Sequence, residues 1–231
     1  MSTVVYNTIA DTVSAQIADW EGDAMIKGTP ELIAGRREEI INACEKLYQA
    51  KSFKEITLKE IGNEVPFSRP TIYNYFQTKE EIFLALFQRE YDRWNKNLTA
   101  ILNRNEPMTK AELAEKIALS LSGREQLLKL LSMNNYDMEA NSRQELLTAF
   151  KESYGRSMHL VCMLLTKFCP DMSASEIQNI IYTFYPFMFG IYPYTAVTEK
   201  QRTAMKEAGI NYVYQTIYEL TYGCLIRLLG E

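Results

Sequence analysis

The residues best suited to specific chemistry lie between Thr57 and Lys79, where polar and aromatic side chains alternate with apolar ones. An arginine fork bonds O6 and N7 of guanine together, threonine can touch a thymine methyl group, and lysine, tyrosine and asparagine bond phosphate oxygens. We predict base-edge contacts by Arg69, Thr71 and Tyr75. The alternatives are a solvated helix-start residue for Arg69 and a packed side chain for Tyr75. The predicted DNA contacts are Arg36, Thr57, Lys59, Ser68, Arg69, Thr71, Tyr73, Asn74, Tyr75 and Lys79.

The sequence offers little for catalysis. His159 is the only histidine, so a Ser-His-Asp or Cys-His arrangement would have to include it. We expect it to be a hydrogen-bonded core residue instead. No serine stands in a G-x-S-x-G pattern, and no phosphate-binding glycine loop or metal-spaced His/Cys cluster occurs. The sequence therefore predicts no catalytic residue, no metal site and no cofactor.

Capping signals predict the helices that would hold the polar face. Thr57 with Glu60, three residues later, is a capping box that starts a helix, and Pro66 cannot continue that helix. Ser68 is a good N-cap, and Pro70 falls in the first turn after it, where a missing N–H costs nothing. The pattern predicts two short helices joined by a tight turn, an arrangement that fits the DNA major groove.

Longer helices are expected on both sides of this motif. One is predicted from Glu31 to Ala50. A further capping box, Thr78 with Glu81, predicts another helix that ends near Asn103. The second of these would contact the motif at one end and a larger domain at the other, which suits it to transmit a change between them.

Residues 71–82, with the sequence Thr-Ile-Tyr-Asn-Tyr-Phe-Gln-Thr-Lys-Glu-Glu-Ile, resemble the signature of the tetracycline-repressor (TetR) family of bacterial transcription regulators. The resemblance covers about residues 33–90. It implies an all-α fold with an N-terminal three-helix helix-turn-helix domain and a larger helical ligand-binding and dimerisation domain. It also implies that Tyr73 and Lys79 grip the DNA backbone.

Three regions follow from this interpretation: an N-terminal extension over residues 1–30, a DNA-binding domain over 31–90, and a sensing and dimerisation domain over 91–231. Apolar spacing in the extension predicts a short helix docked on the body, and its acidic character disfavours a DNA-contacting arm. The sequence departs from the family pattern at Pro66 and Pro70, where family members usually carry glycine.

The overall charge is unusual for a DNA-binding protein. The formal net charge is −4, and residues 31–81 hold eight Lys/Arg against nine Asp/Glu. We expect the basic side chains to face the phosphates while the glutamates point away. The logarithm of the DNA-binding constant should fall with the logarithm of the salt concentration, with a slope of about 0.9 per phosphate neutralised. The four cysteines form no C-x-x-C pair, and we expect buried thiols in a reducing cytoplasm.

Residues 177–198 carry no charge and, at 22 residues, could span a bilayer. Their tyrosines, amide side chains and two prolines favour a helix buried on all sides of a soluble protein, kinked or ended between Pro186 and Pro193. No signal peptide is visible at the N-terminus. We expect a cytoplasmic protein without membrane contact.

Methionine and aromatic side chains on the middle helices suit a pocket for an apolar or aromatic small-molecule effector, although such stripes are also ordinary core. Residues 134–137 are expected to form a loop between these helices. The predicted effector-binding residues are Met133, Tyr136, Tyr154, Met158, His159, Met163, Tyr182, Tyr185, Met188, Phe189 and Tyr192.

The last helix is expected to begin near Arg202 or Gly209 and to end near Leu229, with two adjacent apolar stripes. One stripe would pack on its own domain and the other on a second copy, as the last two helices do in the TetR family. The predicted dimer contacts are Tyr214, Tyr218, Tyr222, Leu225 and Leu229. A dimer relates two helix-turn-helix domains by a two-fold axis, which requires a palindromic operator.

We interpret the chain as a DNA-binding transcription regulator that recognises double-stranded DNA as a homodimer. The resemblance implies a ligand-responsive repressor. The first alternative is a helix-turn-helix adaptor controlled by a protein partner. The second, a small-molecule enzyme, is disfavoured by the missing motifs.

Overall fold

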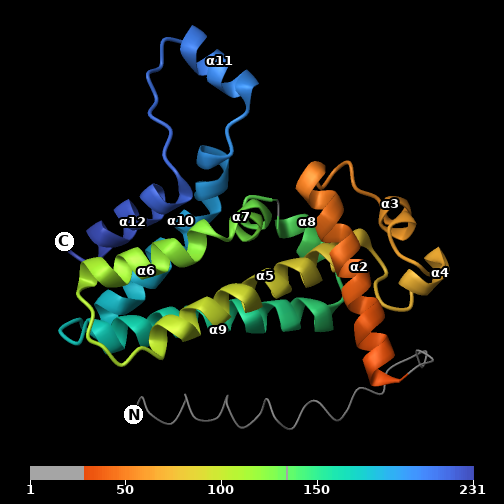
Figure 1. Cartoon of the computed structure of the whole chain (residues 1–231), viewed down its shortest axis with the longest axis horizontal. Helices are drawn as coiled ribbons and strands as arrows, with labels where there is room; N and C mark the ends of the chain where they lie inside the picture. The colour runs from red at the N-terminus through yellow and green to blue at the C-terminus, as the bar shows by residue number, and fades with distance from the viewer. Residues whose placement is uncertain (1–28, 134) are drawn as a thin grey trace. The chain divides into compact units, whose positions relative to one another are not determined.

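The computed structural model describes residues 29–133 and 135–231, and every regular element in these ranges is a helix (Figure 1). This confirms the predicted all-α fold, while the helix expected within residues 1–30 lies outside the described residues. The helices are Pro30–Ala50 (α2), Leu58–Asn63 (α3), Arg69–Ile72 (α4), Lys79–Leu102 (α5), Lys110–Ser122 (α6), Glu125–Leu131 (α7), Asn135–Ala140 (α8), Gln144–Phe168 (α9), Ala174–Thr195 (α10), Glu199–Glu207 (α11) and Ile217–Leu228 (α12).

Residues 37–231 form one compact unit, and the described residues 29–36 do not belong to it. Within residues 37–231, α5 and α9 make the most extensive helix pair and lie side by side (Figure 1). At about 1.5 Å per residue, the 24 residues of α5 span about 36 Å. The predicted boundary at residue 90 falls inside this continuous helix and stays a prediction.

The core follows the aromatic side chains of α5. Phe83, Phe87 and Trp94 are each at most 1% exposed. The Phe83 ring meets that of Tyr48 in α2 edge to face at 5.1 Å, and the Phe87 ring lies 4.8 Å from that of Phe150 in α9. One helix thus contributes to the core beside the short N-terminal helices and to the core of the remaining bundle.

Several predicted boundaries are wrong in the C-terminal half. Residues 135–137, expected as a loop, belong to α8, whose Met138 is buried. Helix α10 continues through Pro186 and Pro193 to Thr195 and is not buried on all sides, since it exposes Tyr182 and other side chains. No described helix is long and apolar enough to cross a membrane.

The expected single last helix is two helices, α11 and α12, with a non-helical segment from 208 to 216 between them. Gly209 has a φ of 72°, a left-handed conformation that favours glycine. The N–H groups of Gly209 and Ile210 donate to the carbonyls of Lys206 and Met205, which closes the end of α11 in a Schellman motif. A capping box of Thr216 with Glu219 then starts α12.

Candidate nucleic-acid interface and effector site

The two short helices α3 and α4 form the predicted helix-turn-helix. The Thr57 hydroxyl accepts from the Glu60 N–H at 3.3 Å, and the Glu60 carboxylate accepts from the Thr57 N–H at 3.0 Å, which confirms the capping box. Gly62 in α3 lies against α4, because a Cβ there would come within 3.4 Å of Cγ of Arg69. The stem of Arg69 is therefore placed by α3.

Helix α4 is shorter than the pattern suggested. It has four residues, and the chain continues with tighter bonds from the Asn74 N–H to the Thr71 carbonyl and from the Tyr75 N–H to the Ile72 carbonyl. Ser68 occupies the N-cap position, but its hydroxyl lies 2.9 Å from that of Thr71 and makes no capping bond. β-Branched and aromatic residues are weak helix formers, which accounts for the short helix.

Six predicted contact residues have exposed side chains on or beside these helices: Thr57, Lys59, Ser68, Arg69, Tyr73 and Asn74. Tyr73 is 49% exposed, and Thr71 is half-buried. Arg36 is half-buried in α2 and lies outside the compact unit of residues 37–231. The exposed set supplies donors suited to phosphates and base edges.

Much of the acidity of the motif and its neighbours is engaged in ion pairs. Glu64 accepts from Lys46 at 2.5 Å and Glu60 accepts from Lys51 at 2.6 Å. Glu45 of α2 is bound by arginines of α5. Lys59 and Arg69 are exposed and are in no ion pair with another described residue.

Two of the predicted DNA contacts, Tyr75 and Lys79, make their contacts within the protein. Tyr75 is 7% exposed, so of its two proposed roles packing fits the structure, and its side chain cannot reach a base edge in this conformation. The Lys79 ammonium group donates to the carbonyls of Phe53 at 2.9 Å and Ile56 at 3.1 Å, and it lies 4.1 Å from the centre of the Phe53 ring. A phosphate contact would require Lys79 to leave these partners.

We therefore expect Lys79→Met to lower the free energy of unfolding by about 1–3 kcal/mol, because two carbonyls lose a charged donor while the aliphatic stem stays. Lys59→Met, at an exposed site, should change it by no more than about 0.5 kcal/mol. Urea denaturation of both variants measures the difference. Equal stabilities would assign Lys79 no structural role.

The predicted effector-binding residues divide into two groups. Tyr185 and Met188 are buried, and Met133, Tyr154, Met158 and Tyr192 are half-buried. The exposed group is His159, Met163, Tyr182 and Phe189. His159 is therefore not the core residue that was expected, because it lies on the outer side of α9. The side chain of Tyr136 is outside the described residues.

The predicted dimer contacts also divide. Leu225 and Leu229 are at most 2% exposed within the single chain, so they cannot also face a second copy. Tyr218 and Tyr222 are half-buried and stacked, with ring centres 5.8 Å apart. Tyr214 precedes α12, and the Arg202 guanidinium lies 4.3 Å from the centre of its ring.

The outer face of α10 carries the apolar surface that was expected on the last helix. Tyr182, Pro186, Phe189 and Pro193 follow one another at spacings of four, three and four residues, and all are exposed. No residue from 177 to 198 is charged. An uncharged exposed face of this length is typical of an interaction surface, because interface cores are depleted of charge.

Comparison with known proteins identifies the family that has this architecture. Residues 40–86 match the family described as bacterial regulatory proteins, tetR family, and residues 88–219 match the tetracyclin repressor-like C-terminal domain. The second match covers more than half of the 231 residues. The chain belongs to the TetR family. It is therefore a transcription regulator and not an enzyme, and helix-turn-helix DNA binding is the family's function.

Curated and solved relatives agree with this assignment. The HTH-type transcriptional regulator HbdR of Aromatoleum sp. (strain CIB) is 29% identical over 69 residues, which cover 30% of this chain and 30% of HbdR. The curated relatives are thus matched over less than a third of their length.

Solved TetR-type regulators share the fold across most of the chain. FadR from Bacillus subtilis in complex with stearoyl-CoA has a TM-score of 0.56 at 16% identity, covering 84% of this chain and 97% of FadR. FadR from Thermus thermophilus in complex with lauroyl-CoA has a TM-score of 0.56 at 18% identity, covering 84% of this chain and 93% of that one.

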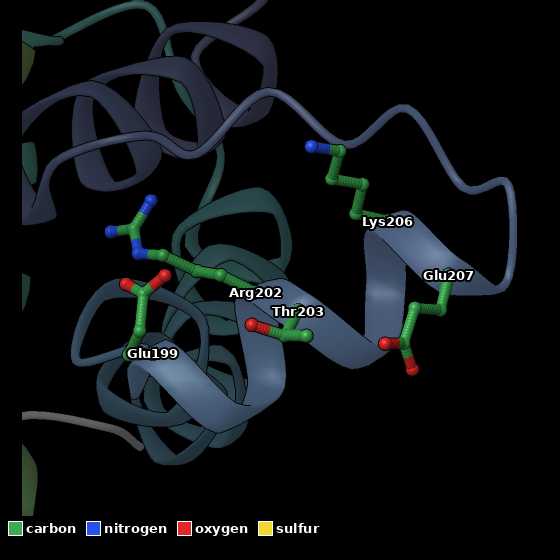
Figure 2. Close-up of a pocket in the computed structure, with 5 residues that line it drawn as sticks. All are labelled: Glu199, Arg202, Thr203, Lys206 and Glu207. Atoms are coloured by element: carbon green, nitrogen blue, oxygen red, sulfur yellow. The ribbon is translucent and has the colours of Figure 1, made fainter.

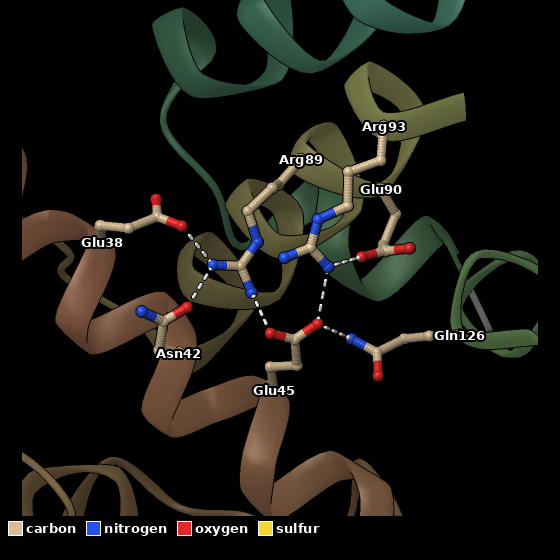
Figure 3. Close-up of polar contacts among 7 residues, drawn as sticks. All are labelled: Glu38, Asn42, Glu45, Arg89, Glu90, Arg93 and Gln126. Atoms are coloured by element: carbon tan, nitrogen blue, oxygen red, sulfur yellow. Dashed lines mark hydrogen bonds and ion pairs between the residues drawn. The ribbon is translucent and has the colours of Figure 1, made fainter. Parts of the chain in front are cut away.

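In this TetR-family chain, an ion-pair network joins α2, α5 and α7 (Figure 3). Arg89 donates to Glu38, to Asn42 and, at 2.7 Å, to Glu45, while Arg93 donates to Glu45 at 2.8 Å. Gln126 of α7 donates to the same Glu45 carboxylate at 3.2 Å. Burial opposes the charge of Arg93, but hydrogen bonds to Glu45 and the nearby Glu90 raise its pKa above the ordinary value.

A second polar junction joins the end of the helix-turn-helix to the start of α9. Arg143 donates to Glu81 from Nε at 2.7 Å and from Nη2 at 3.0 Å, and Nη2 also donates to the Tyr75 carbonyl at 3.0 Å. The Thr78 hydroxyl donates to the Asn141 carbonyl at 2.9 Å. Glu81 is 1% exposed; burial disfavours its charge, but hydrogen bonds from Arg143 and from the Gln77 N–H hold its pKa below the ordinary value.

Sequence reasoning missed this junction. Thr78 accepts from the Glu81 N–H at 3.1 Å, as a capping box requires, but the Glu81 carboxylate turns to Arg143 and to the Gln77 N–H at 2.7 Å. Arg143 lies 62 residues away in the sequence, and no local signal pairs the two. Tyr91 and Asn95, which are buried on α5, could have been noticed because they interrupt its apolar stripe at helical spacing.

A pocket beside α11 is lined by Glu199, Arg202, Thr203, Lys206 and Glu207 (Figure 2). Arg202 and Lys206 extend from one side of the helix and Glu207 from the other. No residue of the predicted effector set lines this pocket, and its charged side chains differ from the apolar lining typical of small-molecule sites.

Proposed function

We propose that this TetR-family regulator is a ligand-responsive repressor that binds a palindromic operator as a homodimer. The observation that carries the proposal is the exposed group of Arg69, Tyr73 and Asn74 on a capped helix-turn-helix. The neighbouring glutamates Glu60 and Glu64 are held in ion pairs. Positive charge and hydrogen-bond donors are thereby left available for DNA.

On DNA, Thr57, Lys59, Tyr73 and Asn74 would contact phosphates, and Arg69 with Thr71 would read base edges. Tyr75 and Lys79 would stabilise the helix-turn-helix without touching DNA, because Tyr75 is buried and Lys79 donates to two backbone carbonyls. One helix-turn-helix domain contacts few base pairs, so useful sequence specificity requires two such domains at a fixed spacing.

The uncharged face of α10 is the proposed dimer surface, with Tyr218 and Tyr222 of α12 at its side. Tyr182 is 62% exposed and Phe189 is 38% exposed, so a second copy would remove substantial apolar area from water. This assignment replaces Leu225 and Leu229 with residues that the single chain leaves accessible. It keeps the pairing of the last long helices that the family resemblance implies.

The effector would be an apolar or aromatic small molecule bound among α5, α9 and α10, where Tyr154, Tyr185 and Met188 lie. Two solved proteins of the same fold were determined with acyl-CoA ligands, which supports a small-molecule effector. A ligand that shifts α9 along α5 would move the helix-turn-helix through Arg143, which donates hydrogen bonds to Glu81 and to the Tyr75 carbonyl. Differential affinity for two states of about 1–3 kcal/mol is sufficient for such control.

A helix-turn-helix adaptor controlled by a protein partner is the second candidate, and the uncharged α10 face is the observation that favours it. Thermal-shift screening of small molecules with and without operator separates the two. A small molecule that stabilises the free protein and weakens operator binding supports the sensor. A protein that occupies the α10 face as a 1:1 partner of the monomer supports the adaptor.

Arg69→Ala should cost about 1–3 kcal/mol of operator binding and relax preference at one base pair, because its guanidinium group would be a base reader. Binding is measured by fluorescence anisotropy on duplexes that vary one base pair at a time. Arg104→Ala, at an exposed site after α5, is the matched control and should bind normally. Uniform weakening on every duplex would make Arg69 a phosphate contact instead.

A further inference from the structure

Two buried polar side chains lie one helical turn apart on α5: Asn95 is hydrogen-bonded to α9, and the ring of Tyr91 packs on that of Tyr154 in α9. The Tyr91 hydroxyl and the Asn95 side-chain oxygen have no hydrogen-bond partner among the described residues. Tyr91 is 0% exposed and Asn95 is 4% exposed. A buried polar group without a partner destabilises the fold, so two of them in adjacent turns require an explanation.

The orientation of Asn95 is fixed by its other side. Its amide nitrogen donates to the Ser153 carbonyl of α9 at 3.0 Å. A carbonyl can only accept, so the nitrogen must face Ser153 and the oxygen must face away from it. The unpartnered atom of Asn95 is therefore its side-chain oxygen, a hydrogen-bond acceptor that lacks a donor.

Tyr91 stands in an aromatic enclosure. Its ring meets that of Tyr154 edge to face at 5.5 Å, and Tyr154 meets Tyr185 in the same way at 5.5 Å. The Tyr185 hydroxyl already donates to Ser157 at 2.8 Å. Burial, reinforced by the neighbouring Tyr185 and Tyr154, raises the pKa of Tyr91 well above its ordinary value, so its hydroxyl keeps its proton and can donate.

The enclosure is uncharged. Among the described residues, no lysine or arginine side chain bonds to Tyr91, Asn95, Tyr154, Ser157 or Tyr185. The charged group nearest in this hydrogen-bond network is Asp92, which accepts from the Ser153 hydroxyl at 2.8 Å on the side toward solvent. A carboxylate or phosphate placed here would lack a counter-charge and would be strongly disfavoured.

We propose that Tyr91 and Asn95 together bind the hydroxyl group of a neutral alcohol or phenol, which is the effector of this regulator. Such a hydroxyl accepts from Tyr91 and donates to Asn95, whereas an ester, a thioester or an ether can only accept. The body of the ligand would lie against the rings of Tyr154 and Tyr185. The inference rests on the proposed function, since it names the chemistry of the effector.

The test uses the full chain and two matched probe pairs, phenol with anisole and 2-naphthol with 2-methoxynaphthalene, together with 2-naphthoate. Calorimetric titration should show at least one hydroxyl compound binding about tenfold or more tightly than its methyl ether, because the ether leaves Asn95 without a donor. The naphthoate should bind weakest. No binding by any probe, equal binding within both pairs, or preference for the naphthoate overturns the proposal.

Tyr91→Phe provides the second measurement. It removes no hydrogen bond to a described residue, so the variant should fold, and the preference for hydroxyl over ether should fall toward one. Tyr182→Phe, on the exposed face of α10, is the control and should keep the preference. If Tyr91→Phe also keeps it, the hydroxyl holds only a buried water, and the proposal fails.

Operator binding without any probe is measured in parallel. Normal operator binding without hydroxyl selectivity rejects this ligand class and leaves the DNA-binding function standing. Hydroxyl selectivity in a protein that binds no DNA rejects the proposed function and leaves the site standing.

Discussion

Glu81→Ala is expected to lower the free energy of unfolding by about 3 kcal/mol. Removing one member of a buried ion pair leaves an uncompensated charge and costs about 3–5 kcal/mol, and the lower end applies because the Arg143 side chain is 31% exposed and can be solvated. The variant also deprives the Gln77 N–H of its acceptor. Urea denaturation followed by circular dichroism measures the loss.

The matched control is Lys151→Ala, which breaks an exposed pair with Glu139 and should change stability by no more than about 1 kcal/mol. Acidity gives an independent readout. The folded pKa of Glu81 is depressed, so its contribution is present above the unfolded pKa and is lost as pH falls through the folded one. The stability difference between wild type and Glu81→Ala should therefore shrink in acid; a difference that is constant from neutral to acid pH would show that the carboxylate charge is not its source.

Phe189→Asp is expected to convert the protein to monomers and to weaken operator binding about 100-fold or more. The substitution places a charge on the apolar face of α10, and burying it unpaired in an interface costs several kcal/mol, each 1.4 kcal/mol of which is tenfold in affinity. Sedimentation velocity measures the oligomeric state, and fluorescence anisotropy measures operator binding.

Leu119→Asp is the control for this prediction, because Leu119 is an exposed apolar residue of α6 with 49% exposure. It should remain dimeric and bind operator normally. Both positions are exposed in the single chain, so circular dichroism should find both variants folded. A dimeric Phe189→Asp with unchanged operator affinity would remove α10 from the proposed interface.

The sequence-based predictions succeeded where the signals are local. The capping box at Thr57 involves residues three apart, and it is present in the structure. The start of α5 at Lys79 and its end near Asn103 were also predicted, because N-caps and apolar periodicity act within one helix. The family signature in residues 71–82 adds fold information that periodicity alone would not supply.

The predictions failed where partners are distant or where periodicity continues through a break. Apolar spacing runs across residues 208–216, so one last helix was expected, but Gly209 adopts a left-handed φ and stops α11. Glu81 was expected to complete its own cap and instead binds Arg143. Lys79 matches the family's DNA-contacting lysine, yet its surroundings in space are carbonyls of Phe53 and Ile56.

The candidate site was predictable in outline only. The exposed set around Arg69 follows from the turn chemistry of one short segment. Which of the effector residues face inward depends on how α9 and α10 pack against α5, and exposed His159 shows that residue type alone does not decide it. Tyr91 and Asn95 interrupt the apolar stripe of α5 in the sequence, but their burial and missing partners are seen only in the structure.

Operator recognition by a homodimer is tested by selecting duplexes from a randomised DNA pool and then sedimenting the protein with the enriched sequence across a salt series. We expect a palindromic consensus and two protomers per duplex. The logarithm of the binding constant should fall linearly with the logarithm of the salt concentration, with a slope of about 0.9 per phosphate contact. Monomeric protein that enriches no sequence and binds no DNA at low salt would contradict operator recognition by a homodimer.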